Sequence, residues 1–157
     1  MSASVPVADI QRARHNLAVN ATDYFLPPAA DMADMADLST WASILPSSVR
    51  VLQANLFGDL FLVDAAGAVY ILDRGGFSAE CISASEQDFW LAVQCDSEGW
   101  QLRPLVDQCR RAGKLLADGQ CYAFTTPPVL GGEYAVENVW VAPVSYTHLT
   151  LPTIFRV

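Results

Sequence analysis

The chain has 157 residues, of which 52% are hydrophobic and 17% charged, a composition that favours one compact domain and excludes a disordered chain. Its net charge is -8 at pH 7, and its nine Lys and Arg residues are spread along the sequence, which argues against the clustered basic residues that bind phosphates. We therefore expect no nucleic-acid partner, and the lack of a run of about 18 apolar residues or of a signal-peptide pattern predicts a cytoplasmic protein without a membrane partner.

Four cysteines occur, and none of them forms a CxxC pair or has a histidine close enough in the sequence to complete a zinc site. The interpretation that we favour is a set of free, buried thiols in a reducing compartment, at Cys81, Cys95, Cys109 and Cys121. The sequence thus predicts no metal and no cofactor.

The first 37 residues carry weak signals. Apolar residues within 1–20 are spaced as in a short helix, and residues 31–38 repeat Asp-Met-Ala twice. The repeat is either a metal-binding carboxylate cluster or the acidic first turn of a helix leading to Trp41. We favour the helix, because its dipole stabilises carboxylates near its N-terminus.

Four short extended segments follow Pro46, and breaks rich in Gly and Asp separate them. These residues tolerate the positive φ angles of tight turns, so the pattern predicts an antiparallel meander of about four strands. The predicted strands are Val49–Asn55, Leu60–Val63, Ala68–Leu72 and Ala79–Ile82.

Two helices are predicted next. Ser85 is a candidate N-cap with Asp88 three residues later, and apolar residues then follow on one helical face, namely Phe89, Trp90 and Val93. The second helix is predicted over about 102–117, with Pro104 in its first turn and Gly119 as its terminator.

Two further strands are predicted around Cys121–Phe124 and Val136–Val141. They bracket a turn that contains two prolines and two glycines, after which Glu133 and Tyr134 are expected to begin the second strand. The chain therefore reads as a single α+β domain, an antiparallel β-meander of about four strands followed by two helices and a final strand pair.

Residues 145–157 resemble a translated sequencing adapter, and Pro152 interrupts any regular pattern there. We expect this segment not to be native and exclude it from functional reasoning, as one would a fusion scar. The expected organisation is a helical or irregular segment over 1–37, an α+β domain over 38–144 and a non-native tail over 145–157.

Catalytic chemistry has little support. A serine or cysteine nucleophile needs a nearby base, usually histidine, and none is close in the sequence; glycine-rich nucleotide motifs are also missing. One enzyme-like option is a set of aspartates beside strand ends, which could support acid-base or metal chemistry if they converge: Asp59, Asp64 and Asp73. We favour turn capping for all three, and predict neither an enzyme nor a small-molecule substrate.

Aromatic and acidic side chains are the candidates for binding a protein partner, since Trp and Tyr are enriched at interface hot spots. We expect Trp41 and Trp90 in the core and the other two tryptophans at the surface. Glu133 and Glu137 flank Tyr134, and they form either a polar binding edge or ordinary solvent-facing positions. The candidate partner-binding residues are Asp59, Trp100, Glu133, Tyr134, Glu137 and Trp140.

A family resemblance rests on four segments, Leu56–Phe61, Asp64–Asp73, Gly119–Phe124 and Pro127–Tyr134, together with Glu137-Asn138. Over roughly residues 38–144, the chain resembles the C-terminal domain of type VI secretion immunity proteins, the partners of antibacterial DNase effectors. The resemblance implies a small cytoplasmic α+β domain, broadly similar to the SUKH group, that binds and blocks a cognate toxin. It brings no catalytic residues.

Three functions remain open from the sequence. The leading hypothesis is an immunity protein that neutralises a cognate secreted toxin by stoichiometric binding, because an acidic inhibitor suits the basic DNA groove of a nuclease effector. The alternative is a SUKH-like interaction or regulatory module without a toxin partner. The third is a hydrolase that uses the three aspartates.

Overall fold

The computed structural model describes residues 21–27, 38–73 and 76–144. The helix expected within 1–20, most of the Asp-Met-Ala repeat and the tail over 145–157 lie outside the described residues. None of the described helices is long and apolar enough to cross a membrane.

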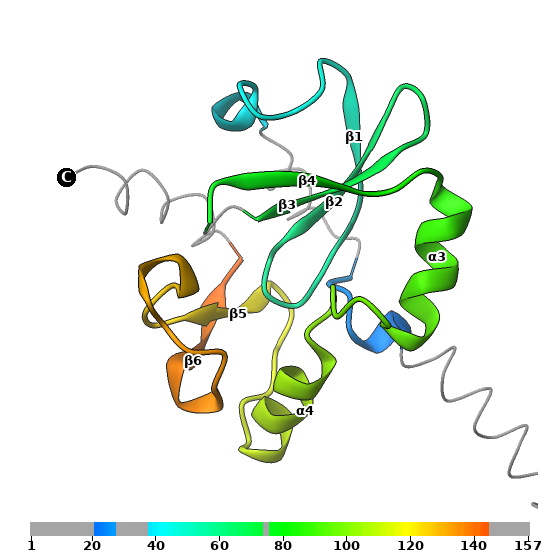
Figure 1. Ribbon diagram of the computed structural model, residues 1–157. Helices are drawn as coiled ribbons and strands as arrows, with labels where there is room; N and C mark the ends of the chain where they lie inside the picture. The colour runs from blue at the N-terminus through cyan, green and yellow to red at the C-terminus, as the bar shows by residue number, and fades with distance from the viewer. Residues whose placement is uncertain (1–20, 28–37, 74–75, 145–157) are drawn as a thin grey trace, which may run out of the picture.

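A four-stranded antiparallel sheet forms the first half of the fold (Figure 1). Its strands follow one another in chain order and are β1 (Val49–Ala54), β2 (Leu60–Asp64), β3 (Val69–Asp73) and β4 (Ser78–Ser83). The predicted meander is confirmed, and the Gly- and Asp-rich breaks at 57–59 and 64–67 form the connections from β1 to β2 and from β2 to β3. β1 and β4 are the two edge strands.

The core lies on both faces of this sheet, and β2 is buried between the two parts. Leu60 and Leu62 pack into a large cluster with β5, β6 and α4, while Phe61 and Val63 pack into a smaller cluster with α3. This division follows from the two-residue period of a strand, which sends alternate side chains to opposite faces. A central strand of this kind reads as a continuous apolar run.

Helix α3 (Glu86–Cys95) begins as predicted. The Oγ of Ser85 accepts a hydrogen bond from the backbone N–H of Asp88 at 3.1 Å, and Phe89 and Val93 are fully buried. The prediction that Trp90 lies in the core is wrong, since its side chain is 36% exposed. Successive helical residues are separated by about 100°, so Trp90 stands at the margin of the face that Phe89 and Val93 present to the sheet.

Helix α4 (Arg103–Arg111) carries Pro104 in its first turn, as predicted, but it ends before residue 117. The chain turns at Gly113, which has a φ of 82°, and the N–H of Lys114 donates to the carbonyl oxygen of Cys109 at 2.9 Å. A glycine with positive φ just after a helix is a common C-terminal stop. Gly113, not Gly119, therefore terminates the helix.

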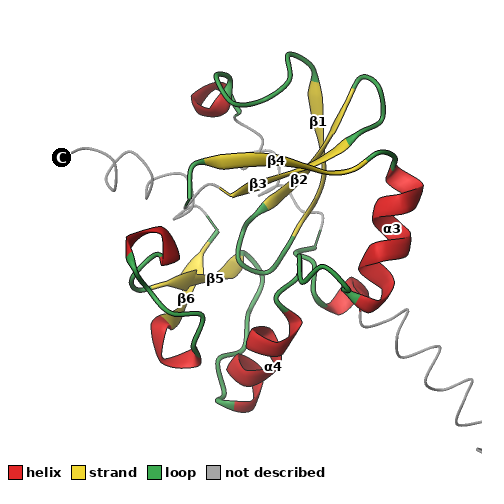
Figure 2. Ribbon diagram, viewed as in Figure 1, coloured by secondary structure: helices red, strands yellow, loops and turns green. Residues whose placement is uncertain are grey.

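A second sheet contains β5 (Gln120–Phe124) and β6 (Val139–Pro143), which pair antiparallel. The strand predicted from Val136 begins three residues later, because Val136–Asn138 form the 3₁₀ helix η3. A second 3₁₀ helix, η2 (Pro128–Leu130), lies in the same connection, and Figure 2 shows both as short helical turns. Glu133 and Tyr134 lie in the loop between them, so the expectation that they begin a strand is wrong.

The segment 21–27 packs against the core although it precedes the sheet by more than twenty residues. The N–H of Leu26 donates to the carbonyl oxygen of Ala54 at 2.8 Å. The guanidinium groups of Arg103 and Arg110 both lie over the ring of Tyr24, 5.1 and 4.9 Å from its centroid, and the Tyr24 hydroxyl donates to Asp107. These contacts fix the segment against α4 and β1. A further 3₁₀ helix, η1 (Ser39–Trp41), buries Trp41, as the sequence predicts.

All four cysteines are free, as expected. Cys109 and Cys121 are buried, but Cys81 and Cys95 are exposed, which contradicts the expectation of buried thiols. Cys81 lies on the edge strand β4 and Cys95 is the last residue of α3, positions that leave a side chain open to solvent.

Candidate functional site

A cleft of about 790 Å³ lies where the two sheets meet. Its walls are the β1–β2 turn, β3, β4, the α3–α4 connection, and β5 with the loop that follows it. Three of the six candidate partner-binding residues line it, namely Asp59, Trp100 and Tyr134. The other three, Glu133, Glu137 and Trp140, are not among its lining residues.

Asn55 organises one wall of the cleft. It is fully buried, and its Oδ1 accepts from the backbone N–H groups of Phe57 and Asp59 at 2.9 and 3.0 Å. Its Nδ2 donates to Asp59 Oδ2 at 3.1 Å and to the carbonyl oxygen of Trp100 at 3.0 Å. This side chain therefore fixes the β1–β2 turn and joins it to the α3–α4 connection. Asparagine suits the position because it both donates and accepts.

An aromatic row runs along the cleft and was not predicted from the sequence. It consists of Tyr122, Phe57, Phe124 and Tyr134, whose ring centroids are separated in that order by 5.4, 5.0 and 5.4 Å. These separations are typical of favourable ring pairs. A partial signal exists in the sequence, because Tyr122 and Phe124 are two apart on β5 and so share a face.

The two candidate tryptophans are both half-buried, although the sequence predicts them at the surface. Trp100 stacks on Phe89 of α3, with ring centroids 5.6 Å apart, and also faces the cleft. Trp140 lies on β6, outside the cleft. Trp100 is therefore an anchor of the fold as well as part of the cleft wall.

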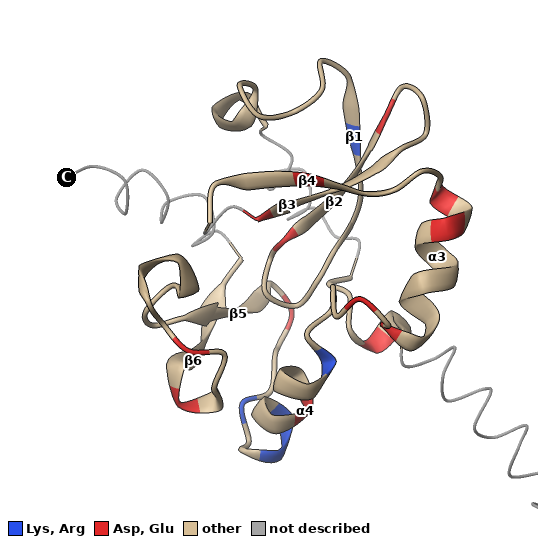
Figure 3. Ribbon diagram, in the orientation of Figure 1, with Lys and Arg blue, Asp and Glu red and all other residues tan. Residues whose placement is uncertain are grey.

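The charged residues that line the cleft, among those described, are all acidic. Four carboxylates line it, those of Asp59, Asp73, Glu80 and Glu98, and its described lining residues include no Lys or Arg. Figure 3 shows why: apart from Arg50, every Lys and Arg among the described residues lies on α4 or just after it. The described lining of the cleft therefore combines negative charge with aromatic rings.

Tyr134 stands at the mouth of the cleft and is 61% exposed. Partial burial, together with the negative charges of Asp73 and Asp59, raises the pKa of its hydroxyl above the ordinary value. The phenol is consequently protonated at neutral pH and is available as a hydrogen-bond donor.

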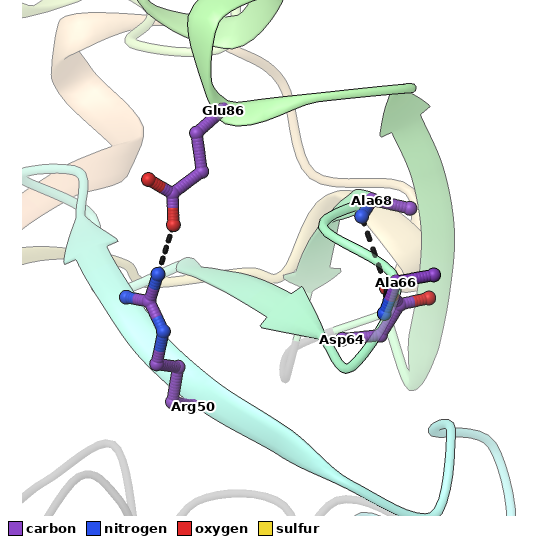
Figure 4. Close-up of polar contacts among 5 residues, drawn as sticks. All are labelled: Arg50, Asp64, Ala66, Ala68 and Glu86. Carbon is purple, nitrogen blue, oxygen red and sulfur yellow. Dashed lines mark hydrogen bonds and ion pairs between the residues drawn. The ribbon is translucent and has the colours of Figure 1, made fainter.

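Asp64 does not join Asp59 and Asp73, so the aspartates considered for a hydrolase do not converge. Asp59 and Asp64 lie at opposite ends of β2, roughly 16 Å apart at the rise of a strand. The Oδ1 of Asp64 accepts from the N–H groups of Ala66 and Ala68, each at 2.9 Å, so it caps the β2–β3 turn as predicted (Figure 4). Asp73 also caps a turn, accepting from Gly76 N–H at 2.9 Å.

Arg50 and Glu86, the other side chains drawn in Figure 4, form an ion pair on the surface between β1 and the start of α3. An exposed pair of this kind contributes about 0–1 kcal/mol to stability. Within the described part of the chain, no three His, Cys, Asp or Glu side chains are placed so that they could hold a metal ion.

The loop from β5 to β6 closes over itself through Asn138. Its Nδ2 donates to the carbonyl oxygens of Thr126 and Glu133 at 2.8 and 2.9 Å, and its Oδ1 accepts from the N–H of Thr126 at 2.9 Å. Gly131 has a φ of 95°, and Gly132 lies so close to Thr126 that a Cβ there would be 1.7 Å from its carbonyl oxygen. Asn138 and the two glycines therefore fix the path of this loop.

Residues 83–151 match the family T6SS immunity protein Tdi1, C-terminal. The match confirms the resemblance predicted from the sequence, and it covers the α3–α4 connection, β5 and the closed loop of the cleft. It starts within β4, so the first strands of the sheet lie outside it.

Among solved structures, the fold is similar to the crystal structure of Atu4351 from Agrobacterium tumefaciens. The two chains are 19% identical with a TM-score of 0.51, over 94% of this chain and 80% of that one. At this identity the likeness concerns the fold alone. No curated protein matches the chain.

Proposed function

We propose that the chain is an immunity protein that binds a cognate type VI secretion effector in the cytoplasm and neutralises it stoichiometrically, without a cofactor or catalysis. The observation that carries this proposal is the match of residues 83–151 to the C-terminal part of a T6SS immunity protein. The cleft supports it, since a groove lined by aromatic rings and carboxylates offers contacts for a protein partner.

A DNase is the effector class that we propose. A nuclease holds DNA in a basic groove, and an acidic inhibitor both associates faster with such a surface and occupies it. The net charge of -8 and the four carboxylates of the cleft suit this role.

The test is co-expression of the full chain with the effector encoded in the neighbouring reading frame. We expect growth to be restored and the two proteins to co-purify in equal amounts, while an unrelated effector is neither bound nor neutralised. A DNA-cleavage assay with the purified pair should show loss of nuclease activity at one equivalent of this chain. Toxicity that persists, with a resident cellular protein recovered in place of the effector, would favour the SUKH-like regulatory module instead.

A further inference from the structure

The cleft has the size and composition of a site for a charged side chain. Its volume of about 790 Å³ lies within the roughly 300–1,000 Å³ typical of binding pockets. Aromatic rings and carboxylates face the same space, and this combination favours a cation, which gains from the charge of the carboxylates and from the faces of the rings.

Among the described residues no Lys or Arg lines the cleft, and three of them bind backbone carbonyl oxygens elsewhere. Arg103 donates to the carbonyl oxygens of Val93 and Gln94, and Arg110 donates to that of Asp23. Lys114 donates to the carbonyl oxygens of Val136 and Val139, each at 2.6 Å. These side chains stabilise the packing of α4, and Arg74, which follows Asp73, lies outside the described residues.

The mouth of the cleft presents apolar surface beside this charge. Val129 and Tyr134 line the cleft and are 51% and 61% exposed, and Leu130, which is 60% exposed, follows Val129 in the loop that Asn138 closes. An exposed apolar and aromatic rim next to a charged recess is typical of protein interfaces, where anchor residues enter a pocket and neighbouring contacts exclude water.

From this arrangement we infer that the cleft receives a basic segment of the effector, with an Arg or Lys side chain entering between the carboxylates of Asp73, Glu80 and Glu98 and the ring of Tyr134. Val129 and Leu130 then cover the apolar part of that segment. The inference rests on the proposed function, and it goes further by naming the surface of this chain and the chemistry of the partner residue.

The test compares two double variants of the full chain with the same change in net charge. Glu80→Gln/Glu98→Gln removes two cleft carboxylates, both from exposed side chains, whereas Asp88→Asn/Asp118→Asn removes two exposed carboxylates elsewhere. Binding to a catalytically inactive form of the effector is measured by calorimetry at low and at physiological ionic strength. We expect the cleft variant to raise Kd about tenfold or more, and the control variant to raise it less than about threefold.

The aromatic contribution is tested with Tyr134→Ala and Tyr134→Phe. The alanine variant should weaken binding about tenfold, whereas the phenylalanine variant keeps the ring and should bind nearly as well as the wild type. Thermal unfolding of each variant checks that the fold is intact.

The outcomes separate the two proposals. If the wild-type chain does not bind or neutralise the effector, the proposed function is wrong. If the wild-type chain neutralises the effector but both charge variants weaken binding equally, or neither does, the cleft is not the docking site and only the inference is overturned. The same conclusion follows if Tyr134→Ala binds like the wild type.

Discussion

Replacing Gly132 with alanine should destabilise the protein more than any other single methyl addition in the β5–β6 loop. The new Cβ would lie 1.7 Å from the carbonyl oxygen of Thr126 and 2.6 Å from its carbonyl carbon. Ordinary van der Waals contact begins at 3.4 Å, so the two backbone segments must separate by roughly 1.7 Å. Backbone atoms on both sides leave no flexible side chain to absorb this movement.

The magnitude follows from the hydrogen bonds that such a separation breaks. They are the two bonds between Asn138 and Thr126, at 2.8 and 2.9 Å, and the bond from Gly132 N–H to the carbonyl oxygen of Pro127 at 3.1 Å. At about 1 kcal/mol for each bond, Gly132→Ala should lower the free energy of unfolding by about 3 kcal/mol. The melting temperature should then fall by about 6–12 °C.

Gly131→Ala is the matched control, since it adds the same methyl group one residue earlier. There the Cβ would meet nothing within 4 Å, and the cost is that of holding alanine at a φ of 95°, about 1–2 kcal/mol. Urea unfolding monitored by far-UV circular dichroism measures both variants. If Gly132→Ala is no less stable than Gly131→Ala, the close approach to Thr126 does not constrain the loop and this reasoning is wrong.

Three further substitutions test the polar contacts of the fold. Asn55→Ala removes a side chain that makes four hydrogen bonds and should lower the free energy of unfolding in urea by about 4 kcal/mol. A loss below about 1 kcal/mol would contradict its role in joining the β1–β2 turn to the α3–α4 connection. Lys114→Met keeps the aliphatic stem but loses two hydrogen bonds to carbonyl oxygens, and should lower the free energy of unfolding by about 2 kcal/mol. Its control, Arg111→Met on the exposed side of α4, should change the free energy of unfolding by less than about 0.5 kcal/mol. Asp96→Asn should stabilise the protein by about 0.5 kcal/mol at pH 7, because asparagine tolerates the φ of 51° and removes a negative charge from the C-terminal end of α3. Burial raises the pKa of Asp96 in the folded protein, so stability falls as the pH rises from the ordinary value of 3.8 to the raised pKa, and the loss is complete above it. The gain from Asp96→Asn should therefore vanish below about pH 3.8, where the carboxyl is protonated in both states.

The strands and the first helix were predictable because their signals are local. Alternation of apolar residues, Gly- and Asp-rich turns, and the serine cap before α3 each act within a few residues of the element that they define. The early end of α4 was less predictable, since Leu116 continues the helical spacing and packs against the core from an irregular segment. The competing signal is Gly113, whose positive φ ends the helix before Leu116.

The cleft was predictable only in part, because tertiary packing assembles it. Asp59, Trp100 and Tyr134 are each candidates because of their own side-chain chemistry, and nothing in their sequence spacing indicates that they line one cleft. Phe57 belongs to the break Phe57-Gly58-Asp59, which in the sequence indicates only a turn between two strands. Its contact with Phe124 depends on β5 lying against the β1–β2 turn, where Tyr122 N–H donates to the carbonyl oxygen of Leu56 at 2.7 Å.

The closed loop between β5 and β6 has a consequence for the strength of binding. A surface that must become ordered when a partner arrives loses about 0.5–1.5 kcal/mol of binding free energy for each side chain that is immobilised. Because Asn138 ties Thr126 to Glu133, the backbone that carries Val129, Leu130 and Tyr134 is already held in place in the unbound protein. A substitution that loosens this loop should therefore leave the association rate unchanged but raise the dissociation rate, which shortens the lifetime of the complex.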